Sequence, residues 1–173
     1  MYPEWAAVTA AGDTFPCSVT QDNYGAYIGW LTGWPNEWCR VVTGYSLSSI
    51  PAAATVENAK LSCSYPSEYG SPFVDFGNIQ ADHIRYDNSN LAEGFSITRT
   101  TALGNILSSS VNSATLDVTA VLNLDRNAGR SALQFRFKFA KEPADPGANP
   151  KFGRFYFNGT GACKPLDVTY LAP

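Results

Sequence analysis

The sequence has little charge and no long apolar run. Charged residues make up 16% of the 173 positions, and 12 Lys and Arg stand against 15 Asp and Glu, for a formal net charge of -3. This is the wrong sign for a surface that binds phosphate backbones, which argues against nucleic acid as a partner. No segment approaches the roughly 20 consecutive apolar residues of a membrane-spanning helix, so we expect no membrane partner either.

Motifs of the common catalytic sites are also missing. The sequence contains no GxSxG, HExxH, P-loop or GxGxxG motif, and its only histidine is His83. A general base needs a partner within hydrogen-bonding reach, and the sequence around His83 shows no such pairing. No two carboxylates stand out as a glycosidase pair. We therefore predict that the protein is not an enzyme, with glycan hydrolysis as a minor alternative.

Neither the N-terminus nor the cysteines assign a compartment. The segment 1–5 lacks the basic and apolar parts of a secretory leader, so the sequence is either a mature fragment with an added Met1 or a product released as virion parts are. We expect an extracellular or virion-surface location. An even number of cysteines without a CxxC pair is compatible with disulfides or with reduced core thiols. They are Cys17, Cys39, Cys63 and Cys163.

A period of two is the strongest pattern that the sequence does contain. From Leu133 to Phe139 every odd position is apolar and every even position is polar. This alternation predicts a strand with one face in the core and one face in water. The same period predicts strands at 41–47, 59–65 and 152–157. Shorter candidates, separated by turn residues, are 6–9, 15–20, 83–86, 95–100, 115–118 and 166–170.

Helical periodicity is sparse by comparison. The best candidate is 117–122, where Asp117 or Thr119 would cap one or two turns. Many short strands with 14 Gly and 11 Pro are typical of an all-β protein. We predict one domain over residues 1–173, an antiparallel β-sandwich of jelly-roll type with about ten short strands and at most one short helix.

Aromatic residues cluster in one segment that glycine and proline make loop-like. Trp30, Trp34 and Trp38 recur every fourth residue, and Tyr27 comes just before them. An indole ring stacks on the apolar face of a pyranose, while neighbouring polar side chains bind its hydroxyl groups. The alternative is that these rings lie in the core or in a subunit contact. The polar candidates for the sugar site are Gln21, Asp22 and Asn36.

A second cluster is rich in oxygen ligands. Asp82, Asp87, Asn90 and Glu93 surround an expected loop, and Ca²⁺ prefers oxygen ligands of this kind. The spacing matches no EF-hand, and loops rich in Asp and Asn commonly use these side chains to form turns. We expect no metal or other cofactor, with calcium at these four residues as the alternative.

Several phrases occur along the chain in an order that resembles a known family. They are Gly12-Asp13-Thr14-Phe15, Asn23-Tyr24-Gly25, the segment 45–61, Leu116-Asp117-Val118-Thr119 and the segment 165–170. Together they resemble the disaggregatase-related DNRLRE-type carbohydrate-binding modules over nearly the whole chain. The resemblance implies a jelly-roll β-sandwich that binds polysaccharide, or is an accessory module of extracellular proteins, without catalysis of its own. The family's tryptophan before the Asp-Val-Thr step is replaced here by the segment 103–106.

The leading hypothesis is a non-catalytic, surface-displayed attachment module whose partner is a polysaccharide or cell-surface glycan. The alternative is a phage virion structural protein, a head decoration or fibre subunit, whose aromatic segment makes subunit contacts. That alternative predicts a homo-oligomer or a larger assembly such as a virion.

Overall fold

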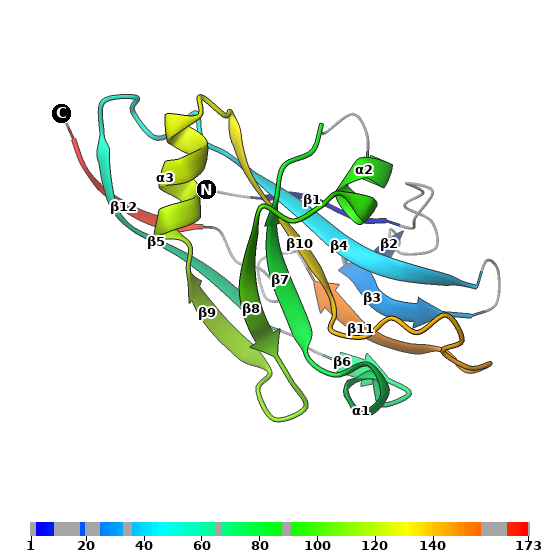
Figure 1. Ribbon diagram of the computed structural model, residues 1–173. Helices are drawn as coiled ribbons and strands as arrows, with labels where there is room; N and C mark the ends of the chain where they lie inside the picture. Colours follow the sequence, from blue (N-terminus) through cyan, green and yellow to red (C-terminus); the bar gives the residue numbers. More distant parts are fainter. Residues whose placement is uncertain are drawn as a thin grey trace.

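The computed structural model describes residues 3–8, 18–19, 25–32, 36–64, 67–87, 91–156 and 166–172. These residues form twelve strands and three short helices (Figure 1). The helices are α1 (Pro72–Phe76), α2 (Leu91–Ser96) and α3 (Thr119–Asn127). The strands are β1 (Pro3–Val8), β2 (Ser18–Val19), β3 (Gly25–Leu31), β4 (Glu37–Ser46), β5 (Thr55–Ser64), β6 (Ser67–Tyr69), β7 (Ile79–Ile84), β8 (Thr101–Leu107), β9 (Ser113–Asp117), β10 (Ala132–Phe139), β11 (Lys151–Tyr156) and β12 (Asp167–Leu171).

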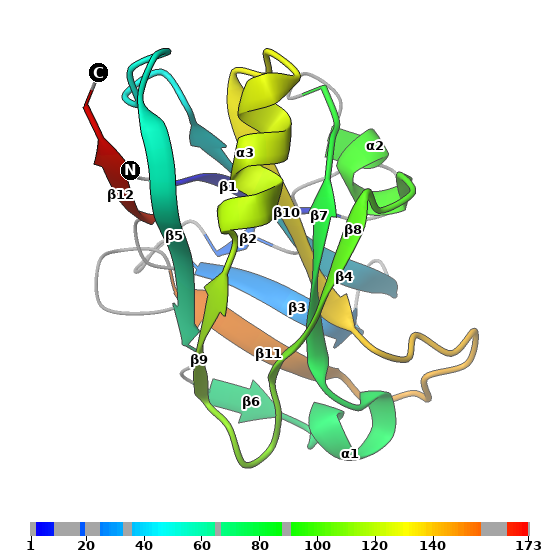
Figure 2. The same cartoon turned by 60° about the vertical axis from the view of Figure 1, so that its left-hand side comes forward.

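The strands of the described residues form two antiparallel sheets. Nine belong to one sheet of order β6-β11-β3-β4-β10-β7-β8, with β1 beside β4 and β2 beside β3; the other sheet is β12-β5-β9. Strand β4 pairs with β3 through residues 37–39 and with β1 and β10 farther along, so the large sheet curls at β4. In Figure 2, β3 and β11 accordingly run across the direction of β7 and β8. The prediction of an all-β antiparallel sandwich is confirmed, with layers of nine and three strands.

The core lies between the two sheets and is closed by α3, which contacts β5 and β10. As the period of two predicted, Leu133, Phe135, Phe137 and Phe139 are all fully buried in this core. The opposite face of β10 is not in water, however. Gln134 and Arg136 are only 2% and 5% exposed. Gln134 is bonded to the Tyr86 backbone, and Arg136 is bonded to carbonyl oxygens of α2 and the residue after it.

The expectation of at most one short helix is wrong, since the described residues contain three. Helix α3 lies where the sequence predicted it, and the Asp117 carboxylate accepts a hydrogen bond from the Thr119 backbone N–H at 2.9 Å. Helices α1 and α2 have five and six residues, which is too short for a 3.6-residue period to show. Helix α2 and the bend after it occupy much of 95–100, which was predicted as a strand; the strand β8 begins later, at Thr101.

Two of the four cysteines lie in described strands. Cys39 in β4 and Cys63 in β5 are buried, and both are disulfide-bonded. For these two residues the structure decides the open alternative in favour of disulfides; Cys17 and Cys163 lie outside the described residues. In the described part of the chain, no helix has the length and apolar character needed to cross a membrane.

Candidate functional site

The aromatic segment is a β-hairpin and not the expected loop. Strands β3 and β4 pair antiparallel, with Trp30 directly opposite Trp38. The two indole rings are neighbours, with centroids 5.7 Å apart and planes inclined by 55°. The glycine that suggested a loop has another role here: Gly29 has a φ of 121°, and a Cβ at this position would come within 2.6 Å of the Lys151 carbonyl oxygen. Glycine therefore permits β11 to pair closely with β3.

Each indole is held by a contact from outside the hairpin. The Nε1–H of Trp30 donates a hydrogen bond to the Gly147 carbonyl oxygen at 3.1 Å. The Trp38 ring meets Phe76 of α1 edge to face, with centroids 4.7 Å apart. Both tryptophans are half-buried and pack against the core on one side. The rings therefore have fixed orientations and retain exposed surface.

These two rings line a groove of about 420 Å³ between the hairpin, α2 and the loop that follows β10. Such a concave site, apolar with a few polar groups, is typical of small-molecule and sugar recognition. The lining residues are Trp30, Asn36, Glu37, Trp38, Arg40, Phe95, Glu142, Pro143 and Ala144.

An ion pair forms one wall of the groove. The Arg40 Nε donates to both carboxylate oxygens of Glu142 at 3.1 Å, and Nη2 donates to the same carboxylate. Arg40 also donates through Nη1 to the Phe95 carbonyl oxygen, and its guanidinium lies 4.0 Å from the centroid of the Phe95 ring. Arg40 thus ties the loop after β10 to α2.

Glu37 supplies an acceptor at the groove that the described residues do not satisfy. Its Oε2 is buried and has no hydrogen-bond partner among them. An unsatisfied buried polar atom costs about 1–3 kcal/mol. The neighbouring Asn36 is exposed.

The structure brings three of the seven predicted sugar-site residues together: Trp30, Asn36 and Trp38. Tyr27 lies on β3 but does not line the groove; it packs edge to face on Phe152, with centroids 4.7 Å apart. The other three predicted residues, Trp34, Gln21 and Asp22, lie outside the described residues.

The sequence analysis missed several residues that complete the groove. Arg40 and Glu142 are separated by 102 positions, so no local pattern could have paired them. Phe95 was assigned to a strand, and a six-residue helix has too few turns to show its period. Only Glu37 could have been found from the local sequence, because it lies between two predicted sugar-site residues, Asn36 and Trp38.

The alternative of a calcium site does not find Asp82 available as a ligand. This residue is 1% exposed, and its carboxylate lies 2.8 Å from Arg136 Nη2 and 3.7 Å from Arg99 Nη1. Because Asp82 forms an ion pair with the buried Arg136, its role is structural. Glu93 instead accepts a hydrogen bond from the Asp87 backbone N–H at 3.2 Å, and Asn90 lies outside the described residues. Within the described ranges, no three His, Cys, Asp or Glu residues form a group that could hold a metal ion.

His83 does have a partner, which the sequence did not reveal. Its Nε2 lies 2.8 Å from Asp125 Oδ2, and Arg85 Nε donates to Asp125 Oδ1 at 2.7 Å. The side chains of His83 and Asp125 are 0% and 1% exposed. The pair joins β7 to α3 in the interior and is closed to a substrate.

No family model matches the chain, and a search of curated proteins finds no match. The resemblance to DNRLRE-type modules stays a prediction. Function is therefore inferred from the geometry and chemistry of the groove.

Proposed function

We propose that the protein is a non-catalytic module that binds polysaccharide in the groove formed by the β3–β4 hairpin, α2 and the loop after β10. The observation that carries this proposal is the Trp30–Trp38 pair. Two neighbouring indoles are held in place, keep exposed surface and line the same groove. Aromatic faces of this kind stack on the apolar faces of sugar rings, and their rigidity lowers the entropy cost of binding.

The inclination of the two rings indicates which shape of polysaccharide fits the groove. A flat crystalline polysaccharide needs coplanar aromatic rings on a flat surface. Here the ring planes are inclined by 55° and lie in a concave site. This arrangement favours a single, bent or branched saccharide chain.

The polar groups of the groove suit sugar hydroxyls. Glu37 has a buried acceptor oxygen that no described residue satisfies, and Asn36 is an exposed amide residue beside it. The charges of Arg40 and Glu142 compensate each other within their ion pair. The groove therefore favours a neutral sugar that donates a hydrogen bond to Glu37.

The same ion pair argues against hydrolysis. Glu37 and Glu142 both line the groove, and most glycosidases use two carboxylates as their catalytic groups. Arg40 donates to both oxygens of Glu142, however, so both oxygens of this carboxylate are occupied by an ion pair. A carboxylate in this state is poorly suited to act as an acid or a nucleophile, and we propose binding without cleavage.

Display outside the cell fits the disulfides. Cys39 and Cys63 are both oxidised, and structural disulfides form and persist mainly in oxidising compartments. We propose an extracellular or virion-surface location on this basis.

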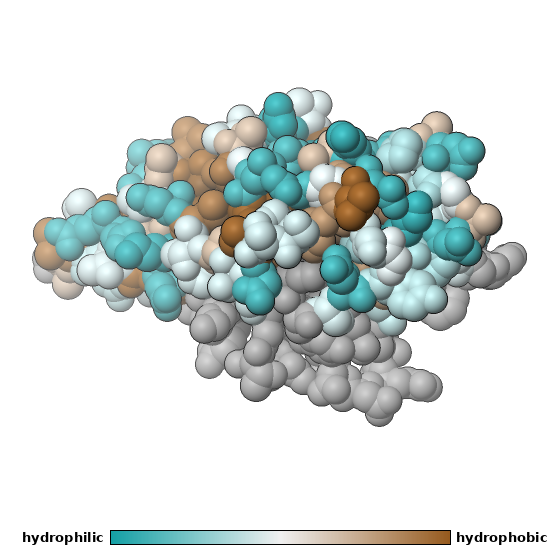
Figure 3. All heavy atoms as spheres, turned by 90° about the horizontal axis from the view of Figure 1, so that it is seen from below, coloured by the Kyte–Doolittle hydropathy of each residue, from teal (hydrophilic) through white to brown (hydrophobic). Residues whose placement is uncertain are grey.

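A second candidate function is assembly, as in a virion subunit. In Figure 3, apolar side chains gather on the half of the molecule that holds β5, β8 and β9. Leu103 and Leu116 are partly exposed on these strands, and Val111 in the connection between β8 and β9 is 46% exposed. Size-exclusion chromatography with light scattering tests this candidate: an oligomer supports it, and a monomer at all concentrations contradicts it for the isolated chain.

Affinity electrophoresis tests the glycan proposal directly. The full chain is run in gels that contain xyloglucan, galactomannan or laminarin, and is also applied to an array of neutral and acidic glycans. We expect retardation by at least one neutral polysaccharide and no release of reducing ends from it. Absence of binding to every gel and every arrayed glycan would contradict the proposal, and release of reducing ends would favour hydrolysis.

A further inference from the structure

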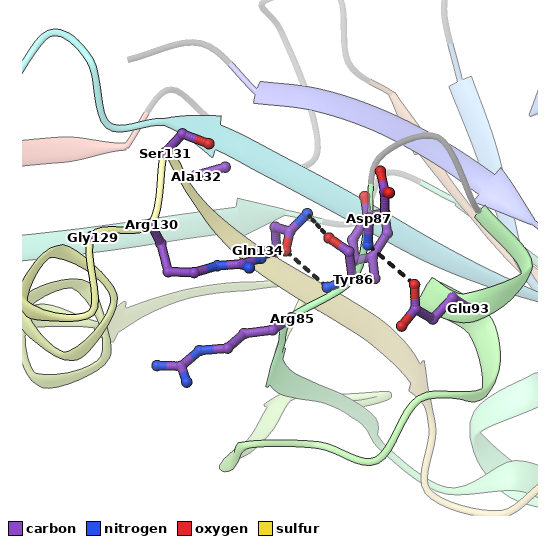
Figure 4. A pocket seen from close by; sticks show the side chains of 9 residues that line it. All are labelled: Arg85, Tyr86, Asp87, Glu93, Gly129, Arg130, Ser131, Ala132 and Gln134. Carbon is purple, nitrogen blue, oxygen red and sulfur yellow. Dashed lines mark hydrogen bonds between the residues drawn. The ribbon is translucent and has the colours of Figure 1, made fainter.

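A second cleft lies on the other side of α2. It has a volume of about 540 Å³, and α2 contributes Glu93 to it, whereas it contributes Phe95 to the first groove. The loop after α3, the first part of β10 and the residues that follow β7 form the other walls (Figure 4). Its lining residues are Arg85, Tyr86, Asp87, Glu93, Gly129, Arg130, Ser131, Ala132 and Gln134.

We propose that this second cleft binds the carboxylate of an acidic sugar, of the uronic acid class, through Arg85 and Arg130. The inference rests on the proposed glycan-binding function and adds a substrate class to it. It would explain why two arginines line a cleft of a protein that has few charged residues.

Arg85 presents an unused donor from a fixed position. Its Nε is bound to Asp125, which is itself held by His83. Its Nη2 is buried and has no hydrogen-bond partner in the described part of the chain, while the side chain as a whole is 32% exposed. A guanidinium is always charged, and its planar set of donors matches a carboxylate. A ligand carboxylate in the cleft would therefore meet the exposed part of this guanidinium.

Arg130 lies on the same half of the cleft as Arg85 (Figure 4). One of its nitrogens donates to Gln134 Oε1 at 3.3 Å, which is long for a hydrogen bond. Gln134 is oriented by Tyr86, whose backbone N–H donates to Oε1 and whose carbonyl oxygen accepts from Nε2, both at 3.0 Å. Because Gln134 already has these partners, Arg130 loses little when it turns to a ligand.

The opposite half of the cleft is acidic, which argues against an inorganic anion as the ligand. Asp87 and Glu93 lie there, away from the two arginines (Figure 4). Their carboxylates would repel an inorganic phosphate or sulfate but accept hydrogen bonds from hydroxyl groups. A sugar with a carboxylate at one end and hydroxyls at the other complements both halves of the cleft, whereas a neutral sugar complements only the acidic half.

Isothermal titration calorimetry of the full chain with oligogalacturonate, its methyl ester and dextran sulfate tests the inference. We expect oligogalacturonate to bind about ten-fold more tightly than the uncharged ester, as a lost charge-assisted hydrogen bond implies. Arg130→Gln should remove this preference and leave binding of the neutral polysaccharides unchanged. Arg99→Gln is the matched control, because Arg99 is an arginine with a 55% exposed side chain that does not line the cleft.

The outcomes separate this inference from the proposed function. Equal affinity for the acid and its ester, or an undiminished preference in Arg130→Gln, would overturn the acidic-sugar site while neutral glycan binding stands. Dextran sulfate that binds as tightly as oligogalacturonate would overturn the choice of a carboxylate. If no glycan of either kind binds, the proposed function fails together with the inference.

Discussion

Trp30 and Trp38 face each other across the β3–β4 pair, with ring centroids 5.7 Å apart. Neither ring depends on the other for its position, since Trp30 is bonded to the Gly147 carbonyl and Trp38 packs on Phe76. The platform is therefore organised before a ligand arrives. This arrangement leads to a first prediction about affinity.

Replacement of Trp30 by alanine should lower the affinity for the retarding polysaccharide at least about ten-fold, because an aromatic anchor of a binding site carries much of its energy. Calorimetry or affinity electrophoresis measures the loss. Tyr170→Ala is the control, since Tyr170 is an exposed aromatic residue of β12 outside the groove. Equal affinities of Trp30→Ala and the parent protein would remove Trp30 from the site.

Glu37→Gln should change affinity and stability in opposite directions. The substitution removes a charge from a side chain whose buried Oε2 has no partner among the described residues, so we expect the free energy of unfolding to rise by about 1 kcal/mol. The weaker amide acceptor should lower the affinity for the polysaccharide several-fold. Urea unfolding and calorimetry on the same sample check both signs. A variant that is less stable than the parent would show that Glu37 has a structural partner.

Asp125→Ala should destabilise the fold and leave the groove intact. The substitution leaves His83 buried without its acceptor and Arg85 without its counter-ion. Leaving a buried polar group without its partner costs about 1–3 kcal/mol, which urea unfolding measures. At urea concentrations at which the variant is still folded, it should bind neutral polysaccharide with the same affinity as the parent protein. Asp167→Ala, at an exposed acid in β12, should be neutral in both measurements.

Asp117 should make stability depend on pH. Hydrogen bonds from the Thr119 side chain and backbone lower the pKa of the Asp117 carboxyl below its usual value. A carboxyl whose pKa is lower in the folded state stabilises the fold above the pKa of the unfolded chain, and this contribution is lost as the pH falls through the folded value. The melting temperature of Asp117→Ala should thus lie below that of the parent near neutral pH and approach it in acid. A constant difference at all pH values would contradict the role of the ionised carboxylate.

Much of the fold was predictable because strand faces leave a local trace in the sequence. The apolar side chains at alternate positions from Leu133 to Phe139 all lie in the core, and the strand at 133–139 was predicted within a residue. The Asp117 signal for α3 was local in the same way. No such trace exists for helices α1 and α2, because one or two helical turns show no period. Strand β3 was not predicted either, because its glycines indicate a turn as long as its partner strands are unknown.

The groove was predictable only in part. Its aromatic residues and Asn36 were found because they are close together in the chain, and an indole suggests sugar stacking from any context. Its walls were not found, since Arg40 meets Glu142 and Phe95 through long-range contacts. Asp82 shows the reverse case. A cluster of acids in the sequence suggested a metal, but Arg136 on a neighbouring strand takes Asp82 into an ion pair.

The amino-acid sequence by itself determined that this protein is a β-sandwich and that three of its four tryptophans lie within one short segment, because side-chain alternation and local composition act over a few residues. Only the tertiary structure decided which polar groups surround those tryptophans, that Cys39 and Cys63 are oxidised, and that two arginines share a cleft beside α2. These features arise where the large sheet curls at β4 and brings distant segments over its outer face. Pairing between strands that are far apart in the chain depends on the packing of the whole core, which no short stretch of sequence records.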